Sequence, residues 1–382
     1  MKITRSVKCY FKKYLTESKK QILNGILEVY HNIVTEAIDI FKNEMVEDEA
    51  SSFYFTLAEN LNKITTKAPA RLKKNAVSEA FGLVSGTYKA SLALASKYSV
   101  PTHNPNRMVL SQTNAQIILD PETKEFDLML KIGAYGTRGS SLYIPLKKNA
   151  LFNKWAGLGK LNNSVLITKD YVQFSFTIET GKKKLEGEML GVDIGMNKLL
   201  ATTQRKFIGD GIIREKLEIL HRKKFASKGY YRAKEDLKET INKLCKELPW
   251  SELSMIVVEN LKNLKKGTKK KKSKKYRRKS KAFRRLLHNW NYRQVLARIQ
   301  ALSEENRVSF RSVSPWKTSQ TCPICGHVEQ KNRLSQELFC CQKCGHSDNA
   351  DFVGAQNILN RFITGSYGIS CKSENMDIKA HV

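Results

Sequence analysis

The sequence lacks two features that would direct it to a membrane or out of the cell. A membrane-spanning helix needs about 20 consecutive apolar residues, and no segment of the 382 residues approaches that length. The N-terminus, Met1-Lys2-Ile3-Thr4-Arg5, does not have the pattern of a signal peptide. We therefore expect a protein with no membrane partner. Its compartment would be the cytoplasm or nucleoid of a prokaryotic cell, or the nucleus if the host is eukaryotic.

Negative charge is also scarce. Asp and Glu number 36 against 67 Lys and Arg, which leaves a formal net charge of +31. A surplus of this size favours a polyanionic partner, because each cation placed against a phosphate releases condensed counterions. An acidic membrane surface would attract the same charge. The length allows two or three domains with cores of their own.

The chain has eight cysteines, and four of them form two C-x-x-C pairs, Cys322/Cys325 and Cys341/Cys344. In a reducing compartment this spacing indicates metal binding before disulfide bonding. Buried or spare thiols are the simplest interpretation of the remaining four, which are Cys9, Cys245, Cys340 and Cys371.

Hydrophobic periodicity divides the chain into three regions. Helical spacing over 16–48 and 75–97 predicts two helices. From about 107 to 180 the apolar residues recur every second position, which predicts short strands in a small barrel or sandwich, with a turn at Asp120-Pro121. A plain structural module would show the same patterns.

The third region alternates strands and helices, as an α/β fold does. We expect a strand at 189–192 with a hairpin partner at 199–203, a long, charged helical stretch over 213–247, and a buried parallel strand at 255–258. A helix at 289–305 and a strand at 308–313 follow.

Two of these strands end in carboxylates. Asp193 follows 189–192 and Glu259 follows 255–258, while Asp351 precedes an apolar, helix-like stretch. Ligands of open α/β sheets bind beyond the carboxyl ends of the strands, so these acids could face one crevice. Mg²⁺ and Mn²⁺ prefer carboxylate ligands, and a pair of such ions can hydrolyse a phosphodiester. A single Asp after a strand is more often a turn or cap residue; the set of three carries the hypothesis.

The cysteine pairs predict a closed tetrahedral zinc site made of Cys322, Cys325, Cys341 and Cys344. A glycine follows each pair, where the backbone must turn sharply around the metal. Cys340 could compete with Cys341, but only Cys341 keeps the two-residue gap to Cys344. We expect His327 and His346 not to be ligands, because four thiolates complete the shell.

The tract from Lys262 to Arg285 is very basic, and three interpretations stay open: a solvated loop, a nuclear localisation signal, or a grip on a phosphate backbone beside Glu259. Nearby aromatic residues could stack on bases. Trp290 and Tyr292 are expected to pack in the core instead, unlike Tyr276 and Phe283.

These motifs, in this order, resemble the TnpB family of RuvC-type RNA-guided nucleases, which are encoded by transposons, and their descendants, the miniature type V CRISPR effectors. The resemblance is carried by Asp193-Ile194-Gly195, Val258-Glu259-Asn260-Leu261, the string from Ser314 to Gly326, and the segments 339–344 and 351–358. It covers about half of the chain, from 185 to 362.

The resemblance implies a catalytic triad of Asp193, Glu259 and Asp351 holding Mg²⁺ or Mn²⁺, and zinc on the four paired cysteines. It implies an α/β RNase H-like (RuvC) catalytic domain with an inserted zinc ribbon, preceded by a helical lobe and a small β-barrel. The activity implied is cleavage of target DNA directed by a guide RNA. The sequence leaves the oligomeric state unknown.

The same resemblance suggests domain boundaries. They are a wedge-like barrel (1–15 and 103–182), a helical recognition lobe (16–102), the nuclease domain (183–317 and 346–362), the zinc ribbon (318–345) and a flexible tail (363–382).

One departure stands beside the last acid. Typical family members have Asn-Ala-Ala where this sequence has Val353-Gly354-Ala355, and Val in place of Asn could weaken hydrogen bonding near the site. Asp348 also lies close, but its spacing from Cys344 favours Asp351 as the ligand. Besides a TnpB-type nuclease, four functions stay open: a miniature CRISPR effector, a guided DNA-binding repressor that does not cut, a guide-independent structure-specific nuclease, and a basic zinc-ribbon DNA-binding protein with structural acids.

Overall fold

The computed structural model describes residues 1–44, 61–93, 95–123, 125–133, 135, 140–260, 286 and 289–365. They divide into two compact units, one over Lys2–Glu179 and one formed by Met1 with the chain from Thr180 onward. The basic tract 262–285, with Tyr276 and Phe283, lies outside the described residues, as do residues 366–382 with Cys371. No helix of the described residues is both long and apolar enough to cross a membrane.

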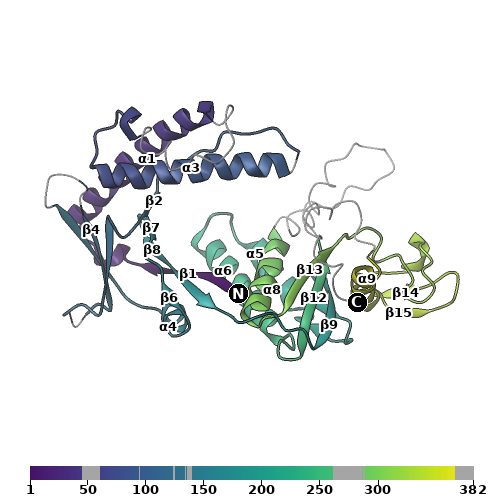
Figure 1. Ribbon diagram of the computed structural model, residues 1–382. Coiled ribbons are helices and arrows are strands. Elements are labelled where there is room, and N and C mark those ends of the chain that lie inside the picture. Colours follow the sequence, from purple (N-terminus) through teal and green to yellow (C-terminus); the bar gives the residue numbers. More distant parts are fainter. Residues whose placement is uncertain are drawn as a thin grey trace. The chain divides into compact units, whose positions relative to one another are not determined.

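Two long helices of the first unit pack against each other, α1 (Glu17–Glu44) and α3 (Ala70–Ala93) (Figure 1). The apolar stripe of α1 is buried, with Tyr30 and Ile33 fully covered. The helix expected over 16–48 is confirmed as far as the structure describes it. The helix expected over 75–97 begins five residues earlier, at Ala70, and ends sooner, because Ala95 adopts a positive φ that a helix cannot continue through.

The strands of this unit form two antiparallel sheets that share a core with the helices. Val172, Phe174 and Phe176 of β8 are buried at alternate positions, as their period predicts. The first sheet has the order β1-β8-β7-β2 with β6 on β8, and the second has the order β3-β4-β5. Their bounds are β1 Lys2–Tyr10, β2 Arg107–Leu110, β3 Ala115–Leu119, β4 Leu128–Gly133, β5 Ser141–Leu146, β6 Lys160–Leu161, β7 Val165–Thr168 and β8 Tyr171–Glu179, with helix α4 at Ala150–Ala156.

Two details of this unit agree with the sequence. Asp120 stands in the turn between β3 and β4 with a positive φ of 48°, a conformation that Asp tolerates. The N-terminal strand β1 pairs with β8 along its whole length, with Ile3 opposite Ile178. Strand pairing among the described residues gives two sheets and not one closed ring, so the barrel stays a prediction.

The second unit is built on a mixed five-stranded sheet of order β11-β10-β9-β12-β13. β9, β10 and β11 are antiparallel neighbours, whereas β12 runs parallel to both β9 and β13. The hairpin and the buried parallel strand are therefore confirmed. The bounds are β9 Glu188–Ile194, β10 Leu200–Thr202, β11 Phe207–Ile208, β12 Leu253–Glu259 and β13 Ser309–Val313.

Helices cover both faces of this sheet. One face shares a core with α5 (Ile212–Arg222), α6 (Lys228–Leu244) and α8 (Tyr292–Glu305). The other packs against α9 (Ala350–Ile363) through Val257, Val313 and Ile358 (Figure 1). Gly191 of β9 permits the close approach of α9, because a Cβ there would collide with the backbone oxygen of Ala355.

The long helical stretch expected over 213–247 is confirmed, but it is divided into two helices. The chain breaks between α5 and α6, where Ala226 has a positive φ of 62° and the Ser227 side chain accepts a hydrogen bond from the Tyr230 backbone amide. Hydroxyl capping of this kind starts a new helix. The expected burial of Trp290 and Tyr292 is confirmed.

A small ribbon lies between β13 and α9. It contains a two-stranded hairpin, β14 (Leu338–Cys340) with β15 (Ser347–Asn349). Short 3₁₀ turns complete the described elements, at Lys12–Tyr14, Cys245–Glu247 and Gln330–Asn332.

Candidate functional site

Three carboxylates approach one another at one end of the mixed sheet. β9 and β12 are parallel neighbours with Val192 opposite Val258, so Asp193 and Glu259 follow at the same edge. Asp193 is the penultimate residue of β9 and Glu259 the last of β12. Asp351 lies in the first turn of α9, whose N-cap Asn349 accepts a hydrogen bond from the Asp351 amide. The sequence placed these acids near strand or helix ends, and the structure brings them within electrostatic reach of one another.

The pKa values of all three acids are raised. Burial and then the negative charges of Glu259 and Asp351 raise the pKa of Asp193 to about 8. Burial also raises the pKa of Glu259 and that of Asp351. Negative charges that lie close together in a partly buried site repel one another and destabilise the fold, unless a bound cation neutralises them. The oxygen-only donor set is the kind that Mg²⁺ or Mn²⁺ binds, so the residues fit such an ion.

Two cations from different elements face Asp351. Lys198, in the turn after β9, lies 4.0 Å from Asp351 Oδ2 and 3.4 Å from Glu337 Oε1. Arg333, in the ribbon, lies 3.7 Å from Asp351 Oδ1. Arg333 also lowers the pKa of Asp193 and that of Glu259, although burial outweighs it in both. The charge of one ribbon side chain therefore acts on all three acids.

Glu259 has partners of its own. The Thr318 hydroxyl donates a hydrogen bond to Glu259 Oε1. The positive charge of Arg361 on α9 also lowers the pKa of Glu259, again outweighed by burial. The Arg361 guanidinium donates to the Ser314 carbonyl at 2.5 Å. Glu259 is thus held by the loop after β13 and lies within the electrostatic influence of α9.

Four sulfur atoms form the second group. The Sγ atoms of Cys322, Cys325, Cys341 and Cys344 all lie within 4.8 Å of one another. Gly326 and Gly345 adopt φ values of 70° and 71°, so each turn after a cysteine pair uses the conformation that favours glycine. Four converging thiols fit a tetrahedral zinc ion, which bound there would brace the ribbon.

Neighbouring candidates stay outside the sulfur cluster. Cys340 belongs to β14 and is not among the four, and His327 instead places Nε2 3.3 Å from Glu329 Oε2. The His346 ring lies beside Phe339. Asp348 accepts two hydrogen bonds from the Arg205 guanidinium, at 2.7 and 2.8 Å.

Val353 and Gly354, where the sequence departs from the family pattern, have different surroundings. Val353 is buried with Cys322, Cys341 and Phe339, so it joins α9 to the core of the ribbon. Gly354 lies against Asp193, since a Cβ there would come 3.0 Å from Asp193 Oδ2. Where typical family members have the polar side chain of Asn, Val353 therefore makes apolar contacts with the core of the ribbon.

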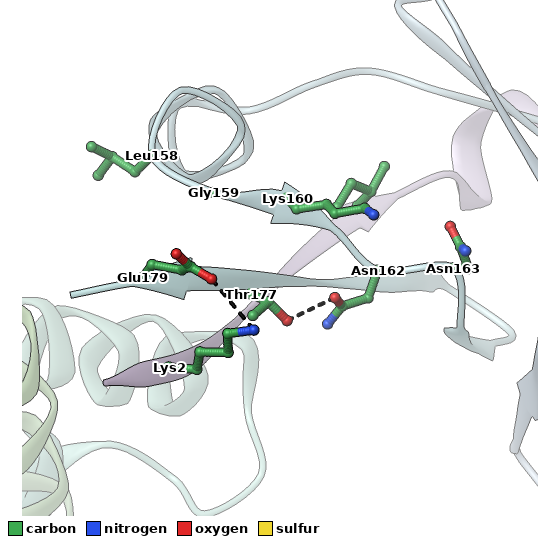
Figure 2. A pocket seen from close by; sticks show the side chains of 9 residues that line it. Lys2, Leu158, Gly159, Lys160, Asn162, Asn163, Thr177 and Glu179 are labelled. Carbon is green, nitrogen blue, oxygen red and sulfur yellow. Dashed lines mark hydrogen bonds and ion pairs between the residues drawn. The ribbon is translucent and has the colours of Figure 1, made fainter. Parts of the chain in front are cut away.

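A separate hollow of about 450 Å³ lies in the first unit, lined mostly by polar residues and by two leucines from β1, β6, β8 and the adjoining turns. Figure 2 shows Thr177 donating to Asn162 and Lys2 paired with Glu179 at its edge. The hollow contains one carboxylate, and that carboxylate is already paired. It offers no convergent metal ligands.

Sequence reasoning missed three residues of the acid site, namely Lys198, Thr318 and Arg333. Thr318 falls inside a motif that carried the family resemblance, yet periodicity gives it no role. Arg333 and Lys198 come from segments that only the tertiary fold brings to the acids.

Comparisons with known proteins add to this geometry. Residues 292–358 match the family model described as Cas12f1-like, TNB domain. A CRISPR-associated endodeoxyribonuclease Cas12f1 of Sulfoacidibacillus thermotolerans is 38% identical over 74 residues, 19% of this chain and 18% of that protein. InsQ of Escherichia coli, named as a candidate RNA-guided DNA endonuclease, is 52% identical over 48 residues, 13% of this chain and 12% of that protein. A TnpB-like protein of Methanocaldococcus jannaschii is 30% identical over 106 residues, 28% of this chain and 34% of that protein.

Solved structures extend the likeness in fold. A Cas12f1–sgRNA–target DNA complex matches with a TM-score of 0.61 at 14% identity, over 94% of this chain and 98% of that one. The mini-RNA-guided endonuclease CRISPR-Cas_phi3 matches with a TM-score of 0.52 at 12% identity, over 94% of this chain and 92% of that one. The chain thus shares the fold of these RNA-guided endonucleases.

The matches confirm the resemblance to the TnpB family and its miniature type V relatives. The aligned segments span about a third or less of the curated relatives named above.

Proposed function

We propose that this chain is a TnpB-like RNA-guided DNA endonuclease that cuts target DNA at an RNase H-like (RuvC) site. The observation that carries the proposal is the convergence of Asp193, Glu259 and Asp351 at the end of a mixed sheet. Relatives named as RNA-guided or CRISPR-associated DNA endonucleases support it, as does the Cas12f1-type fold.

The acids would hold two Mg²⁺ or Mn²⁺ ions, which supply an activated water and a Lewis acid at the leaving oxygen of the phosphodiester. Asp193, which lies against Gly354 of α9, would be one of the metal ligands. Glu259 is oriented by Thr318, and Asp351 by the cap of α9. Arg333, which lies 3.7 Å from Asp351, would contact the phosphate whose charge grows during cleavage. Four cysteines would hold zinc and thereby keep Arg333 in place.

The remaining regions take the roles that the resemblance gives them. The helices at 16–102 would form the recognition lobe, and 1–15 with 103–182 the wedge-like barrel. The domain over 183–317 and 346–362 would cut, with the ribbon at 318–345 inserted into it. A net charge of +31 suits a chain that holds both a guide RNA and target DNA.

The test is to express the chain with its native flanking DNA, purify it and sequence the RNA that accompanies it. RNA from one non-coding stretch beside the gene, ending in a short variable segment, is the expected result. RNA from repeat-and-spacer units would make the chain a miniature CRISPR effector, the second candidate, which the Cas12f1 matches favour. A preparation without enriched RNA would reject guidance and leave a stand-alone nuclease.

Cleavage assays distinguish the proposed nuclease from two proteins that only bind DNA. A guided repressor predicts that Asp193→Ala changes no cleavage, because none occurs, and leaves DNA binding intact. A zinc-ribbon DNA-binding protein with structural acids predicts that Glu259→Gln alters stability. Metal-dependent cutting by the wild type that is abolished by either substitution, with unchanged DNA affinity, rejects both.

A further inference from the structure

The loop between β13 and the ribbon holds a buried hydroxyl against Glu259. Thr318 is only 4% exposed, and its Oγ1 donates to Glu259 Oε1. The Pro315 carbonyl is a second acceptor at 3.3 Å, but the hydroxyl has one hydrogen and the Glu259 oxygen is the nearer acceptor. The hydroxyl is therefore committed to Glu259.

The same loop is fastened to α9 through its backbone. Asn357 is 5% exposed, and its Nδ2 donates to the carbonyls of Thr318 and Thr321, both at 2.7 Å. Arg361, one helical turn further along α9, donates to the Ser314 carbonyl. Both hydrogens of the Asn357 amide are used, so the loop has little freedom to move relative to the helix.

These contacts link two of the acids. α9 carries Asp351 in its first turn and, through Asn357, fixes the position of Thr318, whose hydroxyl fixes the carboxylate of Glu259. The carboxylate would otherwise rotate between several orientations of a flexible side chain. A metal ligand that accepts a hydrogen bond from a fixed donor is pre-oriented, and loss of such a donor typically lowers metal affinity by about 10–100-fold.

We propose that Thr318 is a positioning residue for the metal site, with its buried hydroxyl orienting Glu259 and Asn357 anchoring the loop that carries it. This inference rests on the proposed function, because it takes Glu259 as a metal ligand. A Thr318 that only filled space would need its methyl group and not its hydroxyl.

The test measures Mn²⁺ binding to the full chain from the electron paramagnetic resonance signal of free Mn²⁺. Thr318→Val keeps the shape and removes the hydroxyl, whereas Thr318→Ser keeps the hydroxyl and removes the methyl group. Thr321→Val is the matched control, because the Thr321 hydroxyl lies in the same loop and donates to the Lys317 carbonyl instead. Glu259→Gln marks the affinity that remains without the ligand.

Thr318→Val is expected to weaken Mn²⁺ binding about ten-fold or more, with Thr318→Ser within a few-fold of the wild type and Thr321→Val unchanged. Wild-type affinity in Thr318→Val, in a protein whose affinity does depend on Glu259, overturns the inference and leaves the proposed function standing. Equal affinity in Glu259→Gln and the wild type overturns both. Zinc content and circular dichroism verify folding; if Thr318→Val fails them, Thr318→Cys, a similar shape with a weaker donor, takes its place with a several-fold loss expected.

Discussion

Gly354 of α9 lies against the carboxylate of Asp193, so closely that a Cβ at position 354 would come 3.0 Å from Asp193 Oδ2. The helix therefore forms one wall of the acid site. Asp193 is the acid on which burial and the charges of its two neighbours act together. The packing of a helix on a sheet thus determines the space in which a metal ligand can move.

Gly354→Ala tests this wall. Alanine is favoured over glycine in helices by about 1 kcal/mol, but the added methyl group must displace the Asp193 carboxylate by a few tenths of an ångström. We expect little gain in the free energy of unfolding and a several-fold loss of cleavage. Gly25→Ala in α1 is the control, because a Cβ there meets nothing within 4 Å. It should stabilise the protein by about 0.5–1 kcal/mol and leave cleavage unchanged. Equal effects of the two substitutions would contradict the contact.

The raised pKa of Asp193 predicts a pH-dependent stability in the absence of divalent ions. Its pKa is about 8 in the fold and 3.8 as the ordinary value, so the folded state holds a proton that the unfolded chain releases between these values. Stability contributed by this group is therefore full at low pH and falls as pH rises towards 8.

Asp193→Asn removes that dependence. In Mg²⁺-free buffer, we expect its advantage over the wild type in free energy of unfolding to grow by about 1–3 kcal/mol between pH 5 and pH 8, below the limit of about 1.4 kcal/mol per pH unit. Denaturant melts at the two pH values measure it. Addition of Mg²⁺ should stabilise the wild type and not the variant. A constant difference across pH would show that Asp193 ionises normally.

The sulfur cluster predicts which cysteines bind zinc. Cys341→Ser should lower the zinc content below one ion per chain, loosen the ribbon and remove Arg333 from Asp351, so that cleavage falls with it. Cys340→Ser, one residue away and outside the cluster, should keep full zinc. Atomic emission measures both. Zinc loss in Cys340→Ser with retention in Cys341→Ser would reverse the assignment.

Arg333→Ala separates catalysis from binding. Removing a cation that faces the acids should reduce cleavage by about 100-fold or more, as loss of a charged transition-state contact does. Guide RNA, DNA affinity and zinc content should change little. Lys331→Ala, an exposed cation two residues earlier in the ribbon, is the control. Equal losses in the two variants would indicate a general role of ribbon charge.

The sequence predicted the elements of the second unit well because their signals are local. Buried runs such as 255–258 read as parallel strands, and two C-x-x-C pairs predicted the sulfur cluster. The break at Ala226 and Ser227 was missed, since the apolar stripe continues on both sides of it. The N-cap residue Ser227 starts a second helix even though the helical periodicity continues across the break.

The partners of the acids could not be predicted for a different reason. Lys198, Arg333 and Thr318 reach Asp351 or Glu259 only because a hairpin, a ribbon and a loop fold back to the same sheet edge. The spacing of residues along the sequence does not predict that these three segments come together. The motif around Thr318 carried the family resemblance, and the structure shows that the Thr318 hydroxyl donates a hydrogen bond to Glu259.

Cleavage of DNA tests the central proposal most directly. The purified chain, with its accompanying RNA, is incubated with DNA complementary to the variable segment of that RNA, with and without Mg²⁺. Cutting that requires both Mg²⁺ and complementarity, and that Asp193→Ala abolishes without loss of DNA binding, is the result we predict. Equal cutting by wild type and Asp193→Ala, or no cutting of a DNA that the complex binds, would contradict the assignment of Asp193, Glu259 and Asp351 as a nuclease site.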